Sequence, residues 1–248
     1  MTWSYSRIKS FESCPYKFYL SYIEPMEDKR MFFSDYGLFI HKIIEKYLNK
    51  ELKKEELVKY YLTNFRSNVK GVAPKRATFK SYFVQGLQYL ENMEFPYDDL
   101  LGIEKKVNFC IGDKSFTGFI DCVAKDNGSI IVLDNKSRAL KPRSHRSKPT
   151  KSDNELDEYL KQLYLYSIPI HEEFHIYPER LEFNCFRTRE LISEPFREEA
   201  LEETKKWANE SIEKIINNDD WSPKMEYWKC RHLCSLNHHC IYYQMNKG

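Results

Sequence analysis

Three closely spaced strands between residues 99 and 137 limit the fold of this chain more than any other feature. Residues 107–111 form an apolar run, and residues 116–123 form a second one. Asn127-Gly128 is a strong signal for a two-residue hairpin turn, and residues 130–133 follow it as a buried apolar strand. Because short turns join antiparallel neighbours, the middle of the chain is predicted to form a β-meander.

Helical patterns lie on both sides of these strands. Residues 35–50 carry apolar side chains at the i, i+3, i+4 and i+7 spacing of an amphipathic helix. Further helices are expected at residues 4–14, 15–23, 54–67, 76–93, from Asp153 or Asn154 to about 168, and 195–217, with another strand at 181–187. This order of helices, β-meander, helix, strand and helix predicts a mixed α/β fold around one central sheet.

The composition is that of a globular protein. The chain has 248 residues, of which 42% are hydrophobic and 31% charged, and this excludes wholesale disorder. No break in composition marks a second domain. We therefore expect one domain, with residues 1–95 as a helical N-terminal part, 96–217 as the core and 218–248 as a cysteine-bearing tail. Lys and Arg number 39 against 37 Asp and Glu, so any basic surface must be local.

Neither a membrane span nor a signal peptide is expected. The sequence has no apolar run of about 18 residues, and its N-terminus lacks the apolar stretch of a signal peptide. A cytoplasmic location is the resulting expectation. In that compartment the seven cysteines are expected to be metal ligands or buried thiols rather than structural disulfides.

Two carboxylates and a lysine are predicted to meet at one end of the sheet. Asp121 lies on the second strand, and Asp134 and Lys136 lie just past the third. Adjacent carboxylates repel each other, and a divalent cation such as Mg²⁺ is the usual solution. The backbone carbonyl of Asn135 would add an oxygen ligand, and Lys136 would orient water or offset charge on a phosphate. The alternative is that both aspartates cap strand ends and one of them pairs with Lys136.

Further motifs accompany this group in a fixed order. His41 lies within the early amphipathic helix, where a lone histidine is more often structural. The full set is Ser4-Tyr5-Ser6-Arg7-Ile8, Cys14-Pro15-Tyr16-Lys17-Phe18-Tyr19, His41, Gly118-x-x-Asp121, Asp134-x-Lys136 and Gln162-x-x-x-Tyr166. Taken together in this order, these motifs resemble the RecB-like branch of the PD-(D/E)XK nuclease superfamily, over almost the whole chain.

This resemblance implies a metal-dependent deoxyribonuclease with a restriction-endonuclease-like core, a central mixed sheet flanked by helices. By the same resemblance His41, Asp121 and Asp134 would bind Mg²⁺ or Mn²⁺, and Lys136 would be the catalytic lysine. Gln162 and Tyr166 would contact DNA or steady the site. Asp134 stands where the superfamily often has Glu, a change that the superfamily allows. Glu104 is expected to be an exposed strand residue, with a role as an accessory acid as the alternative.

Four cysteines suggest a second metal site. Cys230, Cys234 and Cys240 lie within eleven residues of the tail, and Cys14 lies before the core. Thiolates suit zinc or iron–sulfur clusters, and zinc would be completed by a tail histidine. One cysteine before the core and three after it resembles the iron–sulfur RecB-like nucleases, including the CRISPR-adaptation exonucleases and AddB. That resemblance implies a 4Fe-4S tail, although the three-residue gap between the first two tail cysteines departs from the usual two and keeps zinc open.

A basic segment follows directly after Lys136. No acidic residue occurs from residue 137 to residue 152, and two prolines oppose a helix. The cations proposed to contact DNA are Arg138, Lys141, Arg143, Arg146 and Lys148. A flexible cationic arm beside a phosphodiester site would neutralise phosphates without reading sequence. The alternative is a solvated loop.

The expected function is metal-dependent hydrolysis of DNA, with exonuclease action on single strands or free ends. The processes in view are recombination, repair and phage or CRISPR DNA processing, in a bacterial, archaeal or phage-infected cell. A helicase, recombination or CRISPR-adaptation partner fits such roles. The alternative is a non-catalytic DNA-binding or assembly subunit on the same fold, against which the intact Asp134-x-Lys136 argues.

Overall fold

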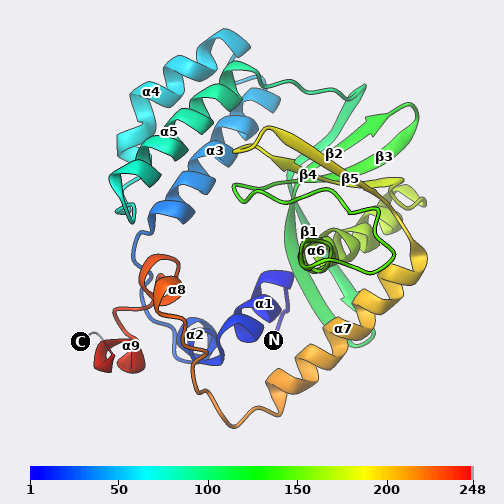
Figure 1. Cartoon of the computed structure of the whole chain (residues 1–248). Coiled ribbons are helices and arrows are strands. Elements are labelled where there is room, and N and C mark those ends of the chain that lie inside the picture. The colour runs from blue at the N-terminus through cyan, green and yellow to red at the C-terminus, as the bar shows by residue number, and fades with distance from the viewer. Residues whose placement is uncertain (247–248) are drawn as a thin grey trace.

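A central five-stranded sheet organises the protein, which is described here by a computed structural model over residues 1–246 (Figure 1). Residues 247–248 of the expected tail lie outside the described residues. The strands are β1 (Asp99–Ile111), β2 (Lys114–Asp126), β3 (Ser129–Asn135), β4 (Arg180–Cys185) and β5 (Glu190–Pro195), in that spatial order. Only the β3–β4 pair is parallel, so the sheet is mixed, as the sequence predicts.

Helices cover both faces of this sheet. They are α1 (Tyr5–Ser13), α2 (Pro15–Phe18), the π-helix η1 (Tyr19–Ile23), α3 (Phe32–Leu48), the 3₁₀-helix η2 (Lys54–Glu56), α4 (Leu57–Asn68), α5 (Arg76–Glu91), α6 (Lys151–Phe174), α7 (Glu198–Ile216), α8 (Tyr227–His232) and α9 (Ile241–Met245). Long helix α6 and its neighbour α7 share a hydrophobic core with one face, which includes Val123 and Val132. Helices α3, α4 and α5 form a second layer with its own aromatic core (Figure 1).

The two ends of α6 differ from the sequence prediction for identifiable reasons. Thr150 is the N-cap, and Asp153 closes a reciprocal capping box, so the helix begins two residues before Asp153. The helix also runs through Pro169 and ends only at His175, whose backbone is left-handed with a φ of 60°. Pro169 and Ile170 are buried, and this packing outweighs the one hydrogen bond that a proline removes.

Strand β5 and the short tail helices are absent from the sequence prediction. Only Ile192 is buried in β5, so the strand has no readable pattern of alternation. Its presence places the start of α7 at Glu198 rather than near Pro195. Strand β1 is longer than its apolar run suggests, because it continues back to Asp99 through an irregularity between Leu100 and Gly102.

The C-terminal tail packs against the N-terminal helices, and α8 and α9 lie beside α2 in Figure 1. The backbone amide of Lys29 donates to the carbonyl of Ser235 at 3.0 Å. The rings of Tyr16 and Tyr242 meet edge to face with centroids 5.0 Å apart. The two ends of the described chain are thus joined. Over these same residues no helix has the length and apolar character needed to cross a membrane.

Candidate active site

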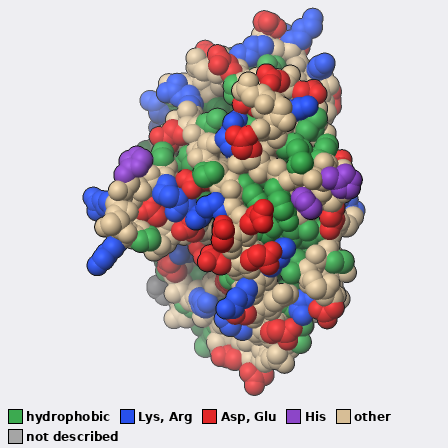
Figure 2. Space-filling view, turned by 90° about the vertical axis from the view of Figure 1, so that its right-hand side faces the viewer, with side chains coloured by type: hydrophobic (Ala, Val, Ile, Leu, Met, Phe, Trp, Pro, Cys, Tyr) green, Lys and Arg blue, Asp and Glu red, His purple; other side chains and the backbone are tan. Residues whose placement is uncertain are grey.

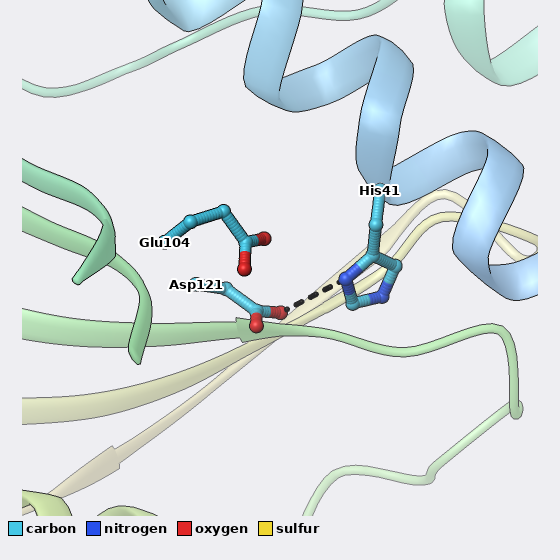
Figure 3. Close-up of side chains that lie close together, drawn as sticks. All are labelled: His41, Glu104 and Asp121. Carbon is cyan, nitrogen blue, oxygen red and sulfur yellow. Dashed lines mark ion pairs between the residues drawn. The ribbon is translucent and has the colours of Figure 1, made fainter. Parts of the chain in front are cut away.

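Three side chains from three elements converge at the middle of β2, beside the point where β3 ends (Figure 3). His41 extends from α3, and its Nδ1 lies 3.4 Å from Oδ2 of Asp121. The carboxylate of Glu104 on β1 faces the same point, and one ligand atom from each residue lies within 4.8 Å of the others. An imidazole and two carboxylates at this spacing form a set of donors that suits a divalent cation.

The place of Glu104 corrects the expectation of an exposed strand residue. Its neighbours Ile103 and Lys105 pair with Cys122 and Ile120, so Glu104 lies opposite Asp121 across the β1–β2 ladder. It is half-buried and has a positive φ of 44°. The sequence could have predicted this position, because the tight turn after Ile111 fixes the register of β1 on β2 and so places Glu104 opposite Asp121.

The backbone of Asn135 connects His41 with Asp121. Its amide donates to Oδ2 of Asp121 at 2.7 Å, and its carbonyl lies 2.9 Å from Nε2 of His41. Both contacts arise because the β2–β3 ladder ends at Leu133, so the backbone of Asn135 bonds to side chains instead of to the β2 backbone. The carbonyl of Asn135 is therefore adjacent to the group formed by His41, Glu104 and Asp121.

Asp134 and Lys136 occupy the neighbouring positions on the α6 side. Nζ of Lys136 lies 2.7 Å from Oδ2 of Asp134 and donates to Oε1 of Gln162 at 3.0 Å. The side chain of Asp134 is 5% exposed, and its Oδ2 has no well-directed hydrogen bond within the described part of the chain. The ammonium group of Lys136 is thus held between a carboxylate and an amide at the rim of the site.

Gln162 and Tyr166 also lie at this site, on one face of α6. Nε2 of Gln162 lies 3.4 Å from the hydroxyl of Tyr166. The ring of Tyr166 packs against Gly118, where an added Cβ would come within 2.6 Å of Cε1. Burial raises the pKa of Tyr166 to about 12, so its hydroxyl remains protonated at neutral pH. Gly118 therefore permits the close approach of α6 to β2.

The carboxylates of the site are electrostatically strained. Burial, followed by the charge of Asp134, raises the pKa of Asp121 well above its usual range. Burial, followed by the charges of Glu45 and Asp134, raises the pKa of Glu104. The pKa of His41 is lowered by burial, which keeps the ring neutral and able to act as a ligand. A bound cation would relieve the repulsion between these acids.

The four cysteines approach one another at the junction of the two chain ends. Burial raises the pKa of Cys234 and of Cys240, and the charges of Cys14 and Cys230 contribute further to both increases. All four thiols are free. Among the described residues, these thiols do not form a group of three at the spacing found around His41.

The basic segment after Lys136 runs without helix or strand to Thr150, as the sequence predicts. Arg143 is tied down, because it contacts Asp157 at 2.6 Å and Glu194 at 2.8 Å. Arg138 pairs with Glu155 on α6. Among the lysines and arginines of this segment, Lys141, Arg146 and Lys148 are exposed and have no ion pair in the described structure. Acidic and basic groups are mixed over the face in Figure 2, in line with a formal net charge of +2.

Two solved structures align with this chain, and one family model matches it. A crystal structure of "Putative exonuclease" from Eubacterium rectale aligns with a TM-score of 0.53 at 12% identity, covering 96% of this chain and 87% of that one. A crystal structure of SSO0001 aligns with a TM-score of 0.33 at 18% identity, covering 84% of this chain and 98% of that one. No curated protein sequence matches. The family model of the PD-(D/E)XK nuclease superfamily matches residues 2–241, and this chain therefore belongs to that superfamily.

Proposed function

We propose that this nuclease hydrolyses DNA phosphodiesters with Mg²⁺ or Mn²⁺ at the site formed by His41, Glu104, Asp121 and Asn135. The observation that carries the proposal is the position of Lys136 beside this group. A nitrogen ligand, two carboxylates and a carbonyl suit a hard divalent cation. Burial and then repulsion between acids raise the pKa values of Asp121 and Glu104, and a cation would offset both effects. The buried, poorly satisfied oxygen of Asp134 makes it a further ligand.

The residues of the candidate site then divide into metal ligands, a catalytic lysine and a residue that positions it. His41, Glu104, Asp121, Asp134 and the carbonyl of Asn135 would hold the metal ion. When bound, the ion supplies Lewis-acid polarisation of a phosphate oxygen and lowers the pKa of water. Lys136 orients the attacking water and places positive charge beside the phosphate as negative charge develops. Gln162 keeps the ammonium group of Lys136 in place through its 3.0 Å hydrogen bond.

A basic groove leading to Lys136 supports a DNA strand as substrate. The groove lies between α1 and α6 and has a volume of about 700 Å³. Its charged lining comprises one acid, Glu158, and five cations, which are Lys9, Lys17, Lys136, Arg138 and Lys229. Positive charge along a groove tracks a phosphate backbone without reading its sequence. Tyr5 and Tyr159 also line the groove, and both rings pack against the hydrophobic core, so they form its apolar base.

The free cations of the basic segment add to this surface. Lys141, Arg146 and Lys148 follow Lys136 along an irregular segment, and Thr150 then starts α6. Arg143 and Arg138 are engaged with acidic side chains, so we assign Arg143 the task of anchoring the segment and Arg138 a place at the groove. The three exposed cations then contact phosphates that extend from the site.

The cysteines are proposed to hold a 4Fe-4S cluster that joins the two ends of the domain. Cys14, Cys230, Cys234 and Cys240 are close enough for their charges to interact. Four thiolates without a histidine suit a cluster, in which each thiolate binds a different iron. The cluster would bridge α2 to the tail and make residues 1–246 one structural domain.

Exonuclease action follows as the proposed mode, supported by the name of the Eubacterium rectale structure. The test uses end-labelled single and double strands of equal sequence, with each end blocked in turn, in the presence of Mn²⁺ and of EDTA. The proposal expects metal-dependent shortening of the single strand from one unblocked end. Cleavage that persists with both ends blocked would instead assign an endonuclease, and DNA binding without any cleavage would favour the non-catalytic subunit.

A further inference from the structure

A cavity of about 280 Å³ lies on the face of the sheet opposite α6. Leu133 and Asn135 of β3 line it, whereas Asp134 between them points to the other face. Its walls come from the end of α3, the end of α5, and residues 94–97, and they include the aromatic rings of Tyr89, Phe95 and Tyr97. Neither the metal site nor the proposed DNA groove uses this space.

Two asparagines form the polar floor of the cavity. Asn135 and Asn184 are register partners on the parallel strands β3 and β4. Nδ2 of Asn184 donates to Oδ1 of Asn135 at 2.8 Å and to the hydroxyl of Tyr89 at 2.6 Å. This leaves Nδ2 of Asn135 and Oδ1 of Asn184 without a hydrogen-bond partner among residues 1–246. Both asparagines line the cavity, and Asn135 as a whole is only 4% exposed, so the cavity is the space in which these two atoms can find a partner.

This floor fits the edge of a nucleobase. Bases present a hydrogen-bond donor beside an acceptor, and an asparagine side chain commonly recognises such an edge. Aromatic and apolar walls bind the flat faces of the ring, as in other pockets that receive a single base. The volume is at the small end for ligand sites, which suits one ring system rather than a larger cofactor.

The charged residues at the rim restrict the type of ligand further. The charged lining residues are Arg189, Glu94 and Glu190, which together carry one net negative charge. A phosphate group would be repelled there. The lining therefore favours an uncharged base or nucleoside over a nucleotide.

We propose that this cavity is a nucleobase-binding site, distinct from the metal site, that reads a base through Asn135 and Asn184. The same base chemistry is available from a free nucleoside or from an unstacked terminal nucleotide of DNA. Asn135 also connects the cavity with the candidate active site, because its backbone contacts both Asp121 and His41. On α3, His41, Ile44 and Leu48 follow one another along one stripe, the first at the site and the others in the cavity.

The test uses 2-aminopurine riboside, a fluorescent nucleoside, titrated with the full chain without added metal. The predicted result is saturable quenching that adenosine reverses, with AMP a weaker competitor. Leu191→Trp, at a rim position 49% exposed, should weaken binding at least 10-fold, and Leu48→Phe should do so from the opposite wall. Ile216→Trp, which is 60% exposed on α7 and outside the cavity, is the matched control and should bind like wild type.

A second arm identifies the source of the base. An oligonucleotide with a terminal 2-aminopurine is titrated with the same proteins, and quenching that Leu191→Trp abolishes would assign the cavity to DNA. Quenching of the riboside alone would assign it to free nucleosides. The proposal is overturned if neither probe binds wild type, or if both cavity variants bind as wild type does. Because no metal is present, a protein that fails to cleave DNA still gives a clear answer.

Discussion

Nδ1 of His41, on helix α3, lies 3.4 Å from Oδ2 of Asp121, on strand β2. Two layers of the protein meet at this contact, the helical layer of α3 to α5 and the sheet with α6. Burial lowers the pKa of His41, while burial and a neighbouring charge raise that of Asp121. Without a cation, this group is therefore a locally unfavourable arrangement, which is typical of a functional site.

Asp121→Asn is expected to stabilise the metal-free protein. A carboxyl group whose pKa is raised on folding contributes stability below its unfolded pKa and loses it as pH rises through its folded pKa. The variant should thus melt at a higher temperature than wild type at pH 7, and the difference should shrink as pH falls toward about 4. Melting curves in EDTA measure this.

Adding Mn²⁺ should make wild type melt at a higher temperature than Asp121→Asn, the reverse of their order in EDTA. A ligand that binds only the folded state raises the melting temperature of wild type. Asp121→Asn removes a proposed metal ligand and should show little shift. Asp121 is a structural residue if the variant melts below wild type in EDTA and Mn²⁺ raises the melting temperatures of both proteins equally.

The exposed cations of the basic segment are expected to contribute non-specific DNA affinity. Changing Lys141, Arg146 and Lys148 to Gln should weaken binding of all sequences alike. The slope of log affinity against log salt should flatten by up to about 0.7 for each lost contact with single-stranded DNA. The control changes Lys53, Lys59 and Arg66, which are exposed on or beside α4, to Gln. Equal slopes for both triple variants would show a solvated loop.

Cys14→Ala is expected to lose the iron–sulfur cluster. Protein purified without oxygen should be brown with about four irons per chain in wild type and colourless in the variant. By analogy with a long disulfide loop, losing this closure should cost about 5 kcal/mol. Cys110→Ala, on the exposed edge of β1, is the control and should stay brown. The cluster is contradicted if wild-type protein is colourless and contains one zinc ion per chain, and if Cys14→Ala retains that zinc ion.

Gly118→Ala should disturb the candidate site through Tyr166. The added methyl would come within 2.6 Å of the Tyr166 ring, and such overpacking costs about 1–3 kcal/mol. Removing the ring by Tyr166→Ala should relieve the clash, so the double variant should be less destabilised than the sum of the single changes. Urea unfolding of the four proteins measures the coupling. Strict additivity would mean that the two residues do not act on each other.

Local sequence patterns predict β1 to β4 and the approach of Asp121 to Asp134, whereas His41, Gln162 and Tyr166 join the candidate site through the family resemblance. The Asn127-Gly128 turn and the apolar run after it specify β2 and β3, and thereby bring Asp121 near Asp134. Glu104 lies outside the apolar run of β1, so only the strand register set by the turn after Ile111 places it opposite Asp121. Strand β5 could not be predicted, since only Ile192 is buried and pairing with β4 supplies the rest of its stability.

Contacts between distant segments were beyond the reach of sequence patterns. The sequence suggests that Arg143 is a free cation. In the structure it forms ion pairs with Asp157 and with Glu194, which lies on β5. The cavity floor requires the parallel pairing of β3 with β4, which sets Asn135 beside Asn184. Neither pairing has a local signal, because each depends on how separate elements pack.

The cleavage of a labelled single strand by wild type, Asp134→Ala and Lys136→Ala in Mn²⁺ tests the central claim most directly. Lys106→Ala, exposed on β1, serves as the control. The account predicts cleavage by wild type and the control that EDTA abolishes, with Lys136→Ala slower by about 10²–10³-fold and Asp134→Ala inactive. Both variants should still bind DNA in the absence of metal. Full cleavage activity in Asp134→Ala and Lys136→Ala would contradict the assignment of this site as the nuclease centre.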